Sequence, residues 1–298
     1  MLCQLVKIIL LPAAPLLLFV SLLAVPRAAQ AQTLYVSAGP GAAGPGVVKI
    51  TPSGTMSTFY FSPNFVTGLA FDAGGNLFVA GDYGSITELN PVGTKTTFAT
   101  GLDPNGFNGI AFDSYGNLFV VDQPGTIFKF TPGGDRSTFA LDGPDYGLTF
   151  DRAGNLFVAA ENGTQIVEYT PTGAESTFAS DGTAFDGLAF DASGNLFATD
   201  FSTGDVYKFT SGGSESVFAS GLSGPFGLTF DIRGNLYVSE YNAGDILEFT
   251  PSGDKSTLVT GLIDPRYMAF GPVPEPSTLA LAGLGALISL AAFRFKES

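Results

Sequence analysis

The chain is built on a short motif that returns about every 40 residues. The motif reads Phe-Asp-x-x-Gly-Asn-Leu followed by Phe or Tyr. Its aspartates are Asp72, Asp113, Asp151, Asp191 and Asp231. A sixth copy is divided between the two ends of the repeat region, with its first half at residues 267–271 and its second half at residues 33–36. A period of this length indicates one supersecondary unit per copy, with neighbouring units burying a shared core.

Each unit carries a second turn signal, Thr-Pro-x-Gly or a close variant. These turns begin at Thr51, Asn90, Thr131, Thr170, Thr210 and Thr250. Pro at the second position and Gly at the fourth suit a type I or type II β-turn. The runs between turn signals are rich in β-branched and aromatic residues, which predicts four strands per unit. In the unit of Asp113 we expect strands at about 109–112, 117–121, 125–130 and 136–140.

Units of about 40 residues with four antiparallel strands are typical of β-propeller blades. Six such units account for residues 32–272. The sequence therefore predicts an all-β, six-bladed propeller of four-stranded antiparallel blades in one domain. The divided unit predicts how the ring closes, because residues 33–61 supply three strands of one blade and residues 267–270 supply the fourth. Aromatic residues that end the first strands are expected to fill the space between blades. They are Phe71, Phe112, Phe150, Phe190, Phe230 and Phe270.

Residues 1–31 have the order of a secretory signal peptide. Lys7 precedes an apolar stretch at residues 8–25, and Ala29-x-Ala31 has the small-residue spacing of a signal-peptidase site. The alternative is an uncleaved membrane anchor, which two prolines within the stretch disfavour. We therefore expect residues 1–31 to be removed on export.

Residues 273–298 combine three features in a fixed order. Pro274-Glu275-Pro276 comes first, an apolar run at 279–293 follows, and Arg294 and Lys296 end the run. A run of about 15 residues is short for a transmembrane helix, which needs about 20. The basic end is expected to stay in the cytoplasm, with the repeat region across the membrane. An ordinary C-terminal tail anchor is the alternative.

This order closely resembles the PEP-CTERM sorting signal. The resemblance implies a Gram-negative bacterium that makes exopolysaccharide, and an exosortase-type membrane enzyme that cuts near Pro274, Glu275 and Pro276. It also implies export to the cell envelope or the extracellular matrix. Exopolysaccharide or another envelope component is then the expected partner, and the membrane is met only through the terminal segments.

The repeat units resemble the NHL repeat and its six-bladed relatives, among them the gluconolactonase family with its regucalcin-like members and the streptogramin lyases. The resemblance covers all of residues 32–272 and implies the propeller fold. It does not define a function, because such propellers bind, scaffold or catalyse according to their loops. The streptogramin lyases need a catalytic histidine, and this sequence contains none.

Composition excludes further classes of function. With no histidine and a single cysteine, Cys3 in the signal segment, the chain cannot form a His-based triad, a His-ligated zinc site or an internal disulfide. Residues 33–273 hold 9 Lys and Arg against 25 Asp and Glu, a net charge of −16. Nucleic acid is therefore not an expected partner, since binding it draws on cationic patches.

Six positions that vary from unit to unit are candidates for a binding site. We expect them just before the first strand of each unit, pointing into the mouth of the central channel. These mouth residues are Thr67, Asn108, Tyr146, Asp186, Phe226 and Arg266. Arg266 is the only basic member and, by unit count, is expected to face Asp186 across the ring, as an anion contact or a neutralising partner.

The gluconolactonase resemblance implies a divalent metal in the channel, held by Glu, Asn and Asp. Asn108-Gly109 and Asp186-Gly187 match the Asn and Asp motifs of that family, and oxygen ligands of this kind suit Ca²⁺ or Mg²⁺. No Glu occupies a mouth position, which departs from the family pattern. The alternative is that Asn108 and Asp186 serve the turn leading into each strand.

A second ring of acids follows the second strand of five units. Its members are Asp82, Asp122, Glu161, Asp200 and Glu240. We expect these side chains to accept backbone N–H groups of the following turn, with surface Ca²⁺ binding as the alternative.

Two functions from different classes follow from these features. The favoured one is an exported, non-catalytic propeller, sorted through its PEP-CTERM signal to the envelope or exopolysaccharide matrix, with a binding or structural role. The alternative is a metal-dependent, lactonase-like hydrolase that uses Asn108 and Asp186. No nucleophile–base pair, phosphate-cradling loop or paired-carboxylate motif stands out, so no catalytic residue is predicted.

Overall fold

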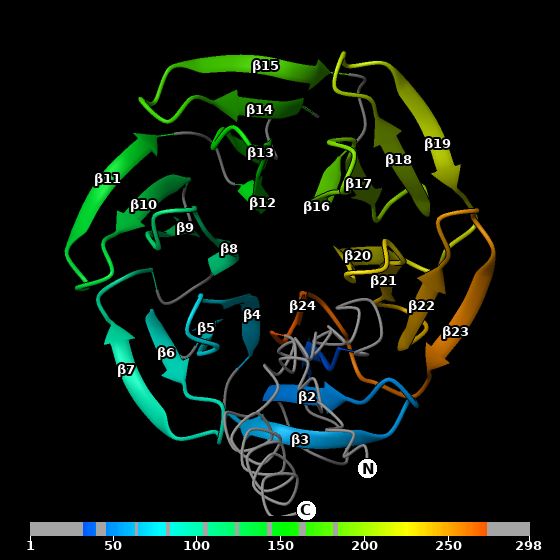
Figure 1. Ribbon diagram of the computed structural model, residues 1–298, viewed down its shortest axis with the longest axis horizontal. Helices are drawn as coiled ribbons and strands as arrows, with labels where there is room; N and C mark the ends of the chain where they lie inside the picture. Colours follow the sequence, from blue (N-terminus) through cyan, green and yellow to red (C-terminus); the bar gives the residue numbers. More distant parts are fainter. Residues whose placement is uncertain are drawn as a thin grey trace, which may run out of the picture. The chain divides into compact units, whose positions relative to one another are not determined.

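The predicted all-β architecture is confirmed by the computed structural model. The structure describes residues 32–39, 46–62, 65–81, 84–103, 107–122, 125–141, 145–160, 165–180 and 184–272. Within these ranges every regular element is a β-strand, and the strands form six four-stranded antiparallel sheets. Figure 1 shows the sheets as six blades around a central axis. The segments predicted as signal peptide and sorting tail lie outside the described residues.

Each blade runs outward from the axis through four strands. The first strands, nearest the axis, are β4 (Val66–Phe71), β8 (Phe107–Phe112), β12 (Asp145–Phe150), β16 (Phe185–Phe190), β20 (Pro225–Phe230) and β24 (Met268–Phe270). The second strands are β5 (Leu77–Gly81), β9 (Leu118–Asp122), β13 (Leu156–Ala160), β17 (Leu196–Asp200), β21 (Leu236–Glu240) and β1 (Leu34–Ala38).

The outer two strands complete each blade. The third strands are β6 (Ser85–Leu89), β10 (Thr126–Phe130), β14 (Gln165–Tyr169), β18 (Asp205–Phe209), β22 (Asp245–Phe249) and β2 (Gly46–Ile50). The fourth strands are β7 (Lys95–Ala99), β11 (Arg136–Leu141), β15 (Glu175–Ser180), β19 (Glu215–Ala219), β23 (Lys255–Val259) and β3 (Met56–Phe61).

One blade, the closing blade, joins the two ends of the described chain. Its sheet order is β24-β1-β2-β3, and β24 pairs antiparallel with β1. Beyond the last strand pair, the N–H of Gly271 donates to the carbonyl of Thr33 over 2.9 Å, and Nε2 of Gln32 donates to the carbonyl of Gly271 over 3.0 Å. The ring closure predicted from the divided repeat is confirmed.

The recurrent motifs form the turns at one end of every blade. In the Asp113 turn, the carboxylate accepts the backbone N–H of Asn117 over 2.8 Å and its side-chain amide over 2.7 Å, while Gly116 has a φ of 80°. The other four complete copies of the motif make the same two bonds. The motif aspartate is therefore committed to its own turn, and it recurs because every blade needs this turn.

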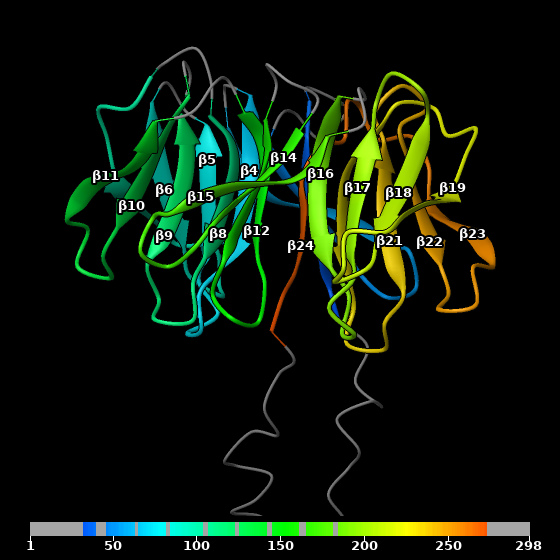
Figure 2. The same cartoon turned by 90° about the horizontal axis from the view of Figure 1, so that it is seen from above.

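The two ends of the propeller differ in what they carry. We call the end with the Asp-x-x-Gly-Asn turns the turn rim, and the end where the first strands begin the mouth rim. β24 runs toward the turn rim and β1 starts there (Figure 2). A Cβ on Gly75, in the first of these turns, would lie 3.2 Å from the ring of Pro272. Both ends of the described chain therefore lie at the turn rim.

Aromatic rings fill the space between blades, as predicted. At each of the six junctions, the aromatic residue near the start of the second strand meets the Phe that ends the first strand of the next blade, edge-on, with centroids 4.9–5.1 Å apart. These pairs are Tyr35–Phe71, Phe78–Phe112, Phe119–Phe150, Phe157–Phe190, Phe197–Phe230 and Tyr237–Phe270. Each such pair is favoured by about 0.5–1.5 kcal/mol beyond its burial.

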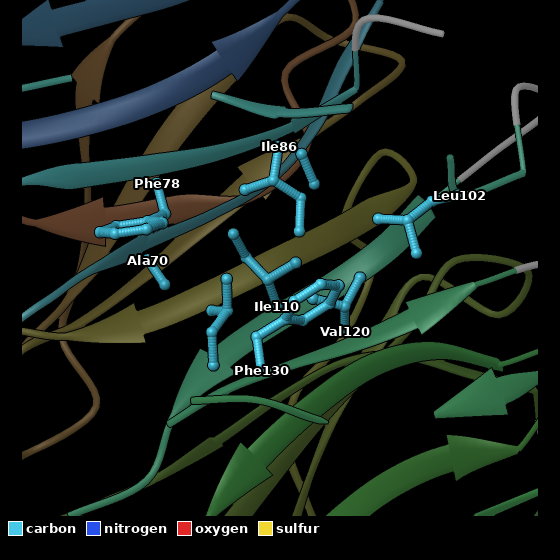
Figure 3. Packing of buried hydrophobic residues seen from close by; sticks show 9 residues of the cluster. Ala70, Phe78, Ile86, Leu102, Ile110, Val120 and Phe130 are labelled. Carbon is cyan, nitrogen blue, oxygen red and sulfur yellow. The ribbon is translucent and has the colours of Figure 1, made fainter. Parts of the chain in front are cut away.

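Aliphatic side chains surround these ring pairs. Figure 3 shows the cluster between the β4–β7 and β8–β11 blades, where Ala70 and Ile86 of one blade pack with Ile110, Val120 and Phe130 of the next. The core of the propeller is thus a ring of clusters between blades. In the part of the chain that the structure describes, no helix has the length and apolarity to cross a membrane. The apolar run at 279–293 lies outside that part.

Candidate binding site on the mouth rim

Five of the six mouth residues lie within the first strands rather than just before them, which corrects the sequence prediction. In β4, β8, β12, β16 and β20 the ladder to the second strand contains a β-bulge after its first pair. In β16 the bulge holds Asp186 and Gly187 opposite Thr199. A glycine follows each of these five mouth residues and interrupts the β-prone pattern, so the strand was expected to begin later. Only Arg266 precedes its strand.

The bulge glycines allow the inner strands to approach one another. A Cβ on Gly227 would clash with the carbonyl oxygen of Arg266, and a Cβ on Gly187 would clash with that of Phe226. Only a residue without a side chain leaves room for a neighbouring backbone at this level. The backbone of the mouth residues is therefore packed against the next blade.

Buried hydroxyl groups on the second strands complete this contact. Oγ of Ser239 accepts the N–H of Gly227 over 2.9 Å and donates to the carbonyl of Arg266 over 2.7 Å. The hydroxyl of Thr199 makes the equivalent pair of bonds one blade earlier. Both side chains are 0% exposed. Each hydroxyl ties the bulge of its own blade to the mouth residue of the next, so the mouth rim has a rigid base.

The side chains of the mouth residues differ in burial. Asp186 and Phe226 are 7% and 8% exposed, whereas Thr67 and Arg266 are half-buried. The hydroxyl of Thr67 donates to the carbonyl of Ala80 over 3.4 Å. The side chains of the two remaining mouth residues, at positions 108 and 146, lie outside the described residues.

Arg266 does not face Asp186 across the ring. Asp186 is in β16 and Arg266 immediately precedes the Tyr267 that leads into β24, so the blade that begins with β20 lies between them. The expected opposition came from a wrong count of units around the ring. Oδ2 of Asp186 accepts the backbone N–H of Phe201 over 3.0 Å, which holds the loop after β17.

Three of the five predicted acids, Asp122, Asp200 and Glu240, end second strands and accept backbone N–H groups, as predicted, but not always from the following turn. The other two, at positions 82 and 161, lie outside the described residues. Oδ1 of Asp200 accepts the N–H groups of Ser202 and Thr203 in the turn that follows. Asp122 and Glu240 accept an N–H group from the loop that precedes the first strand of their own blade. These carboxylates hold the loops of the mouth rim in place.

Arg266, at the start of the closing blade, lies among aromatic side chains from three other blades. Its guanidinium carbon is 5.3 Å from the ring centroid of Tyr241, 5.6 Å from that of Phe226 and 5.9 Å from that of Phe65. Phe201 meets Tyr241 edge-on at 5.7 Å. We call these five residues the Arg266 cluster. Such rings within about 6 Å stabilise a cation through their quadrupoles.

The guanidinium of Arg266 has no hydrogen bond or ion pair with any residue that the structure describes, and its Nε is buried without a partner. By contrast, Nη1 of Arg136 donates to the carbonyl of Gly101 over 3.0 Å. Phe65 and Phe201 are 55% and 36% exposed, so solvent reaches the rings beside the charge. The cluster presents unmet N–H donors together with apolar ring surface.

Sequence reasoning found two members of the Arg266 cluster and missed three. Phe226 and Arg266 were among the mouth residues, whereas Phe65, Phe201 and Tyr241 stand in loops. A signal was present for two of these, because an aromatic residue directly follows the acid in Asp200-Phe201 and Glu240-Tyr241. Phe65 carries no comparable signal, since only the fold brings it near Arg266.

The predicted metal centre stays a prediction, because the side chain of one of its two ligands, at position 108, lies outside the described residues. No three Asp, Glu or Cys side chains come together in the described ranges. Asp186 is the one predicted ligand whose side chain is described, and one of its oxygens accepts a backbone N–H. Ca²⁺ takes six to eight oxygen ligands. The one described carboxylate does not by itself define a metal site, so no reaction step is derived through a metal.

Fold and C-terminal motif together define the class of this protein, a six-bladed β-propeller that carries a protein-sorting signal. Residues 272–296 match the PEP-CTERM protein-sorting motif, which confirms the predicted signal. No curated protein matches the chain.

Solved structures resemble the propeller. One chain of a nidogen/laminin complex aligns with a TM-score of 0.69 and 20% identity, over 82% of this chain and 99% of that one. A streptogramin B lyase aligns with a TM-score of 0.63 and 16% identity over 81% and 91% of the two chains. Virginiamycin B lyase from Staphylococcus aureus aligns with a TM-score of 0.55 and 19% identity over 64% and 69%. At such identities the likeness shows the fold alone.

Proposed function

We propose that this protein is an exported, non-catalytic β-propeller, sorted through its PEP-CTERM signal to the envelope or exopolysaccharide matrix of a Gram-negative bacterium, where the mouth rim binds a partner. One observation carries the proposal. The sorting motif begins at residue 272, directly after Gly271, whose N–H makes the last bond of the ring closure. The signal therefore follows a complete domain, as a sorting tail requires.

The position of the motif also gives the propeller an orientation. The chain reaches residue 272 at the turn rim, and the Arg266 cluster lies at the mouth rim, one strand length away. Six strand residues span about 20 Å at 3.3 Å per residue. When the exosortase holds the tail in the membrane, the turn rim is directed toward the membrane and the mouth rim is directed away from it. A partner then reaches the mouth rim from outside.

A lyase activity like that of the structural neighbours is not part of the proposal. One neighbour is described as a catalytically inactive His-to-Ala variant of virginiamycin B lyase with quinupristin bound. That description ties the activity of the Staphylococcus aureus enzyme to a histidine, and this sequence has none. Binding without turnover is the function that this residue set supports.

Replacement of Pro274, Glu275 and Pro276 by alanine in the producing cells tests the sorting step. We expect an uncut chain to accumulate in the membrane fraction, because the exosortase loses its recognition motif. A matched control is Pro171→Ala, in a surface turn of the propeller, which should leave processing unchanged. Unaltered processing of the triple variant, read by the size of the chain in membrane and external fractions, would refute the proposed sorting.

The non-catalytic part of the proposal is tested against the metal-dependent, lactonase-like hydrolase that uses Asn108 and Asp186. Metal analysis of the purified chain is combined with a lactone hydrolysis assay before and after chelation. We expect no turnover that depends on Ca²⁺ or Mg²⁺. A stoichiometric metal whose removal abolishes hydrolysis would replace our proposal with the hydrolase.

A further inference from the structure

The geometry points to the Arg266 cluster as a binding site for a carboxylate carried on a six-membered ring. The inference rests on the proposed binding role of the mouth rim and names the chemistry of the ligand. Among the described residues, Arg266 lies within 6 Å of three ring centroids, whereas Lys129, Arg136 and Lys208 each lie over one ring.

The charge and the unmet donors of Arg266 specify the anionic half of the ligand. Aromatic rings favour the positive charge but do not replace acceptors for its N–H groups. A guanidinium offers five donors in a rigid planar fork, which matches the two oxygens of a carboxylate. Tyr241 and Phe226 hold the side chain at the mouth rim, so little conformational freedom is lost when the anion binds.

The exposed rings specify the other half of the ligand. Phe201 and Phe65 offer partly exposed ring faces or edges beside the guanidinium. Oδ2 of Asp186 holds the backbone of Phe201, which makes Asp186 a positioning residue for this cluster. A flat ring with an apolar face packs against such surfaces, as in sites that combine aromatic walls with a few polar groups. A uronate sugar and an aryl carboxylate share this chemistry.

The charge of the domain limits how many carboxylates the ligand carries. Residues 33–273 have a net charge of −16, so a dense polyanion meets repulsion over the surface around the cluster. Asp186 and Glu240 lie on the same rim, although each accepts a backbone N–H there. The site therefore suits a single carboxylate on an otherwise neutral ligand.

Two matched pairs of small ligands test the inference on the full purified chain. Methyl glucuronoside is compared with methyl glucoside, and benzoate with benzamide, so that each pair differs in the carboxylate. Acetate serves as a carboxylate without a ring. We expect at least one ring carboxylate to bind about tenfold more tightly than its neutral counterpart and than acetate, measured by ligand titration in NMR. The pair that shows the preference identifies the source as sugar or aryl.

Variants then assign the preference to the cluster. Arg266→Gln should abolish the preference for the carboxylate, and Arg266→Lys should retain part of it, because Lys keeps the charge but lacks the fork. Phe201→Ala should weaken both members of the preferred pair about threefold. Arg136→Gln removes a cation that lies over Phe128 on an outer strand, and it should change nothing.

Three results would overturn the inference: equal binding within both pairs, acetate binding as tightly as the ring carboxylates, or a preference that persists in Arg266→Gln. Folding of each variant is verified by its thermal transition, and Arg266→Lys provides a second substitution if Arg266→Gln unfolds. Processing at the sorting motif is read separately in cells. A negative binding result therefore leaves the sorting proposal intact. A negative result for processing at the sorting motif leaves the binding measurements interpretable.

Discussion

The ring of Tyr237 in β21 meets the ring of Phe270 in β24 edge-on, with the two centroids 4.9 Å apart. The pair repeats the contact found at the other five junctions, but here it joins the last complete blade to the closing blade. β24 has three residues and pairs with β1 from the opposite end of the described chain. Ring closure therefore depends on a short strand and on the aromatic side chain that ends it.

Phe270→Ala should destabilise the propeller by about 3 kcal/mol, since it removes a partly buried ring from a packed junction. Urea unfolding measures the change. Phe150→Ala removes the equivalent ring at an interior junction, where it lies 5.0 Å from Phe119. We expect Phe270→Ala to cost at least as much, because β24 has few other contacts to retain it. A clearly smaller cost would show that closure does not depend on this ring.

Ending the chain after Pro272 should change the free energy of unfolding by less than about 0.5 kcal/mol. The reason is that the closing hydrogen bonds all lie at or before Gly271. Ending it after Tyr267 removes β24 and leaves β1 as an open edge, so the cost should exceed about 3 kcal/mol. Thermal unfolding of the two shortened chains distinguishes them, and equal transitions would contradict the closure described above.

Gly227→Ala should destabilise by more than about 2 kcal/mol, because the new Cβ meets the carbonyl of Arg266, which lies just before the neighbouring strand β24. Gly212→Ala is the matched control. The nearest atom to its new Cβ is 3.9 Å away and its φ is not positive, so the change should stay within about 0.5 kcal/mol. Similar losses for the two variants in chemical denaturation would show that the close approach of β20 and β24 is not required.

Ser239→Ala should cost about 1–3 kcal/mol, because the buried N–H of Gly227 and carbonyl of Arg266 both lose their hydroxyl partner. The control is Ser216→Ala on the exposed side of β19, where the hydroxyl makes one 3.4 Å bond to a carbonyl. That variant should lose less than about 0.5 kcal/mol. The prediction is wrong if both serines prove equally dispensable in unfolding experiments.

The stability of the propeller should fall as the pH rises above about 10. Burial raises the pKa of Tyr237, and its hydrogen bond to Glu248 and the charge of that carboxylate raise it further. The unfolded chain then loses the Tyr237 proton at a lower pH than the folded chain. The contribution of protonated Tyr237 to the free energy of unfolding is therefore complete below the pKa of the unfolded chain and is lost as the pH rises through the alkaline range. Tyr237→Phe should flatten this decline relative to Tyr115→Phe at an exposed turn. Unfolding midpoints between neutral and alkaline pH provide the measurement, and identical slopes would contradict it.

The architecture was predictable because its signals are local. The turn at Asp113 needs only Gly116 and Asn117, which lie three and four residues away, and each Phe that ends a first strand follows from the same repeat. The site was less predictable. The bond from Asp186 to the backbone of Phe201 was not predicted, since the partner of a carboxylate depends on which backbone groups surround it.

The sequence by itself determined the number of blades, the strands within them and the divided blade that closes the ring, because turns and strand alternation depend on residues a few positions apart. Only the tertiary structure decided that Phe65, Phe201, Phe226 and Tyr241 surround Arg266. Together with Arg266 those residues belong to four blades, and their proximity follows from the β-bulges, the glycine contacts between first strands and the closure of the ring. Contacts across such separations arise when the whole ring is formed, and no short segment of the chain encodes them.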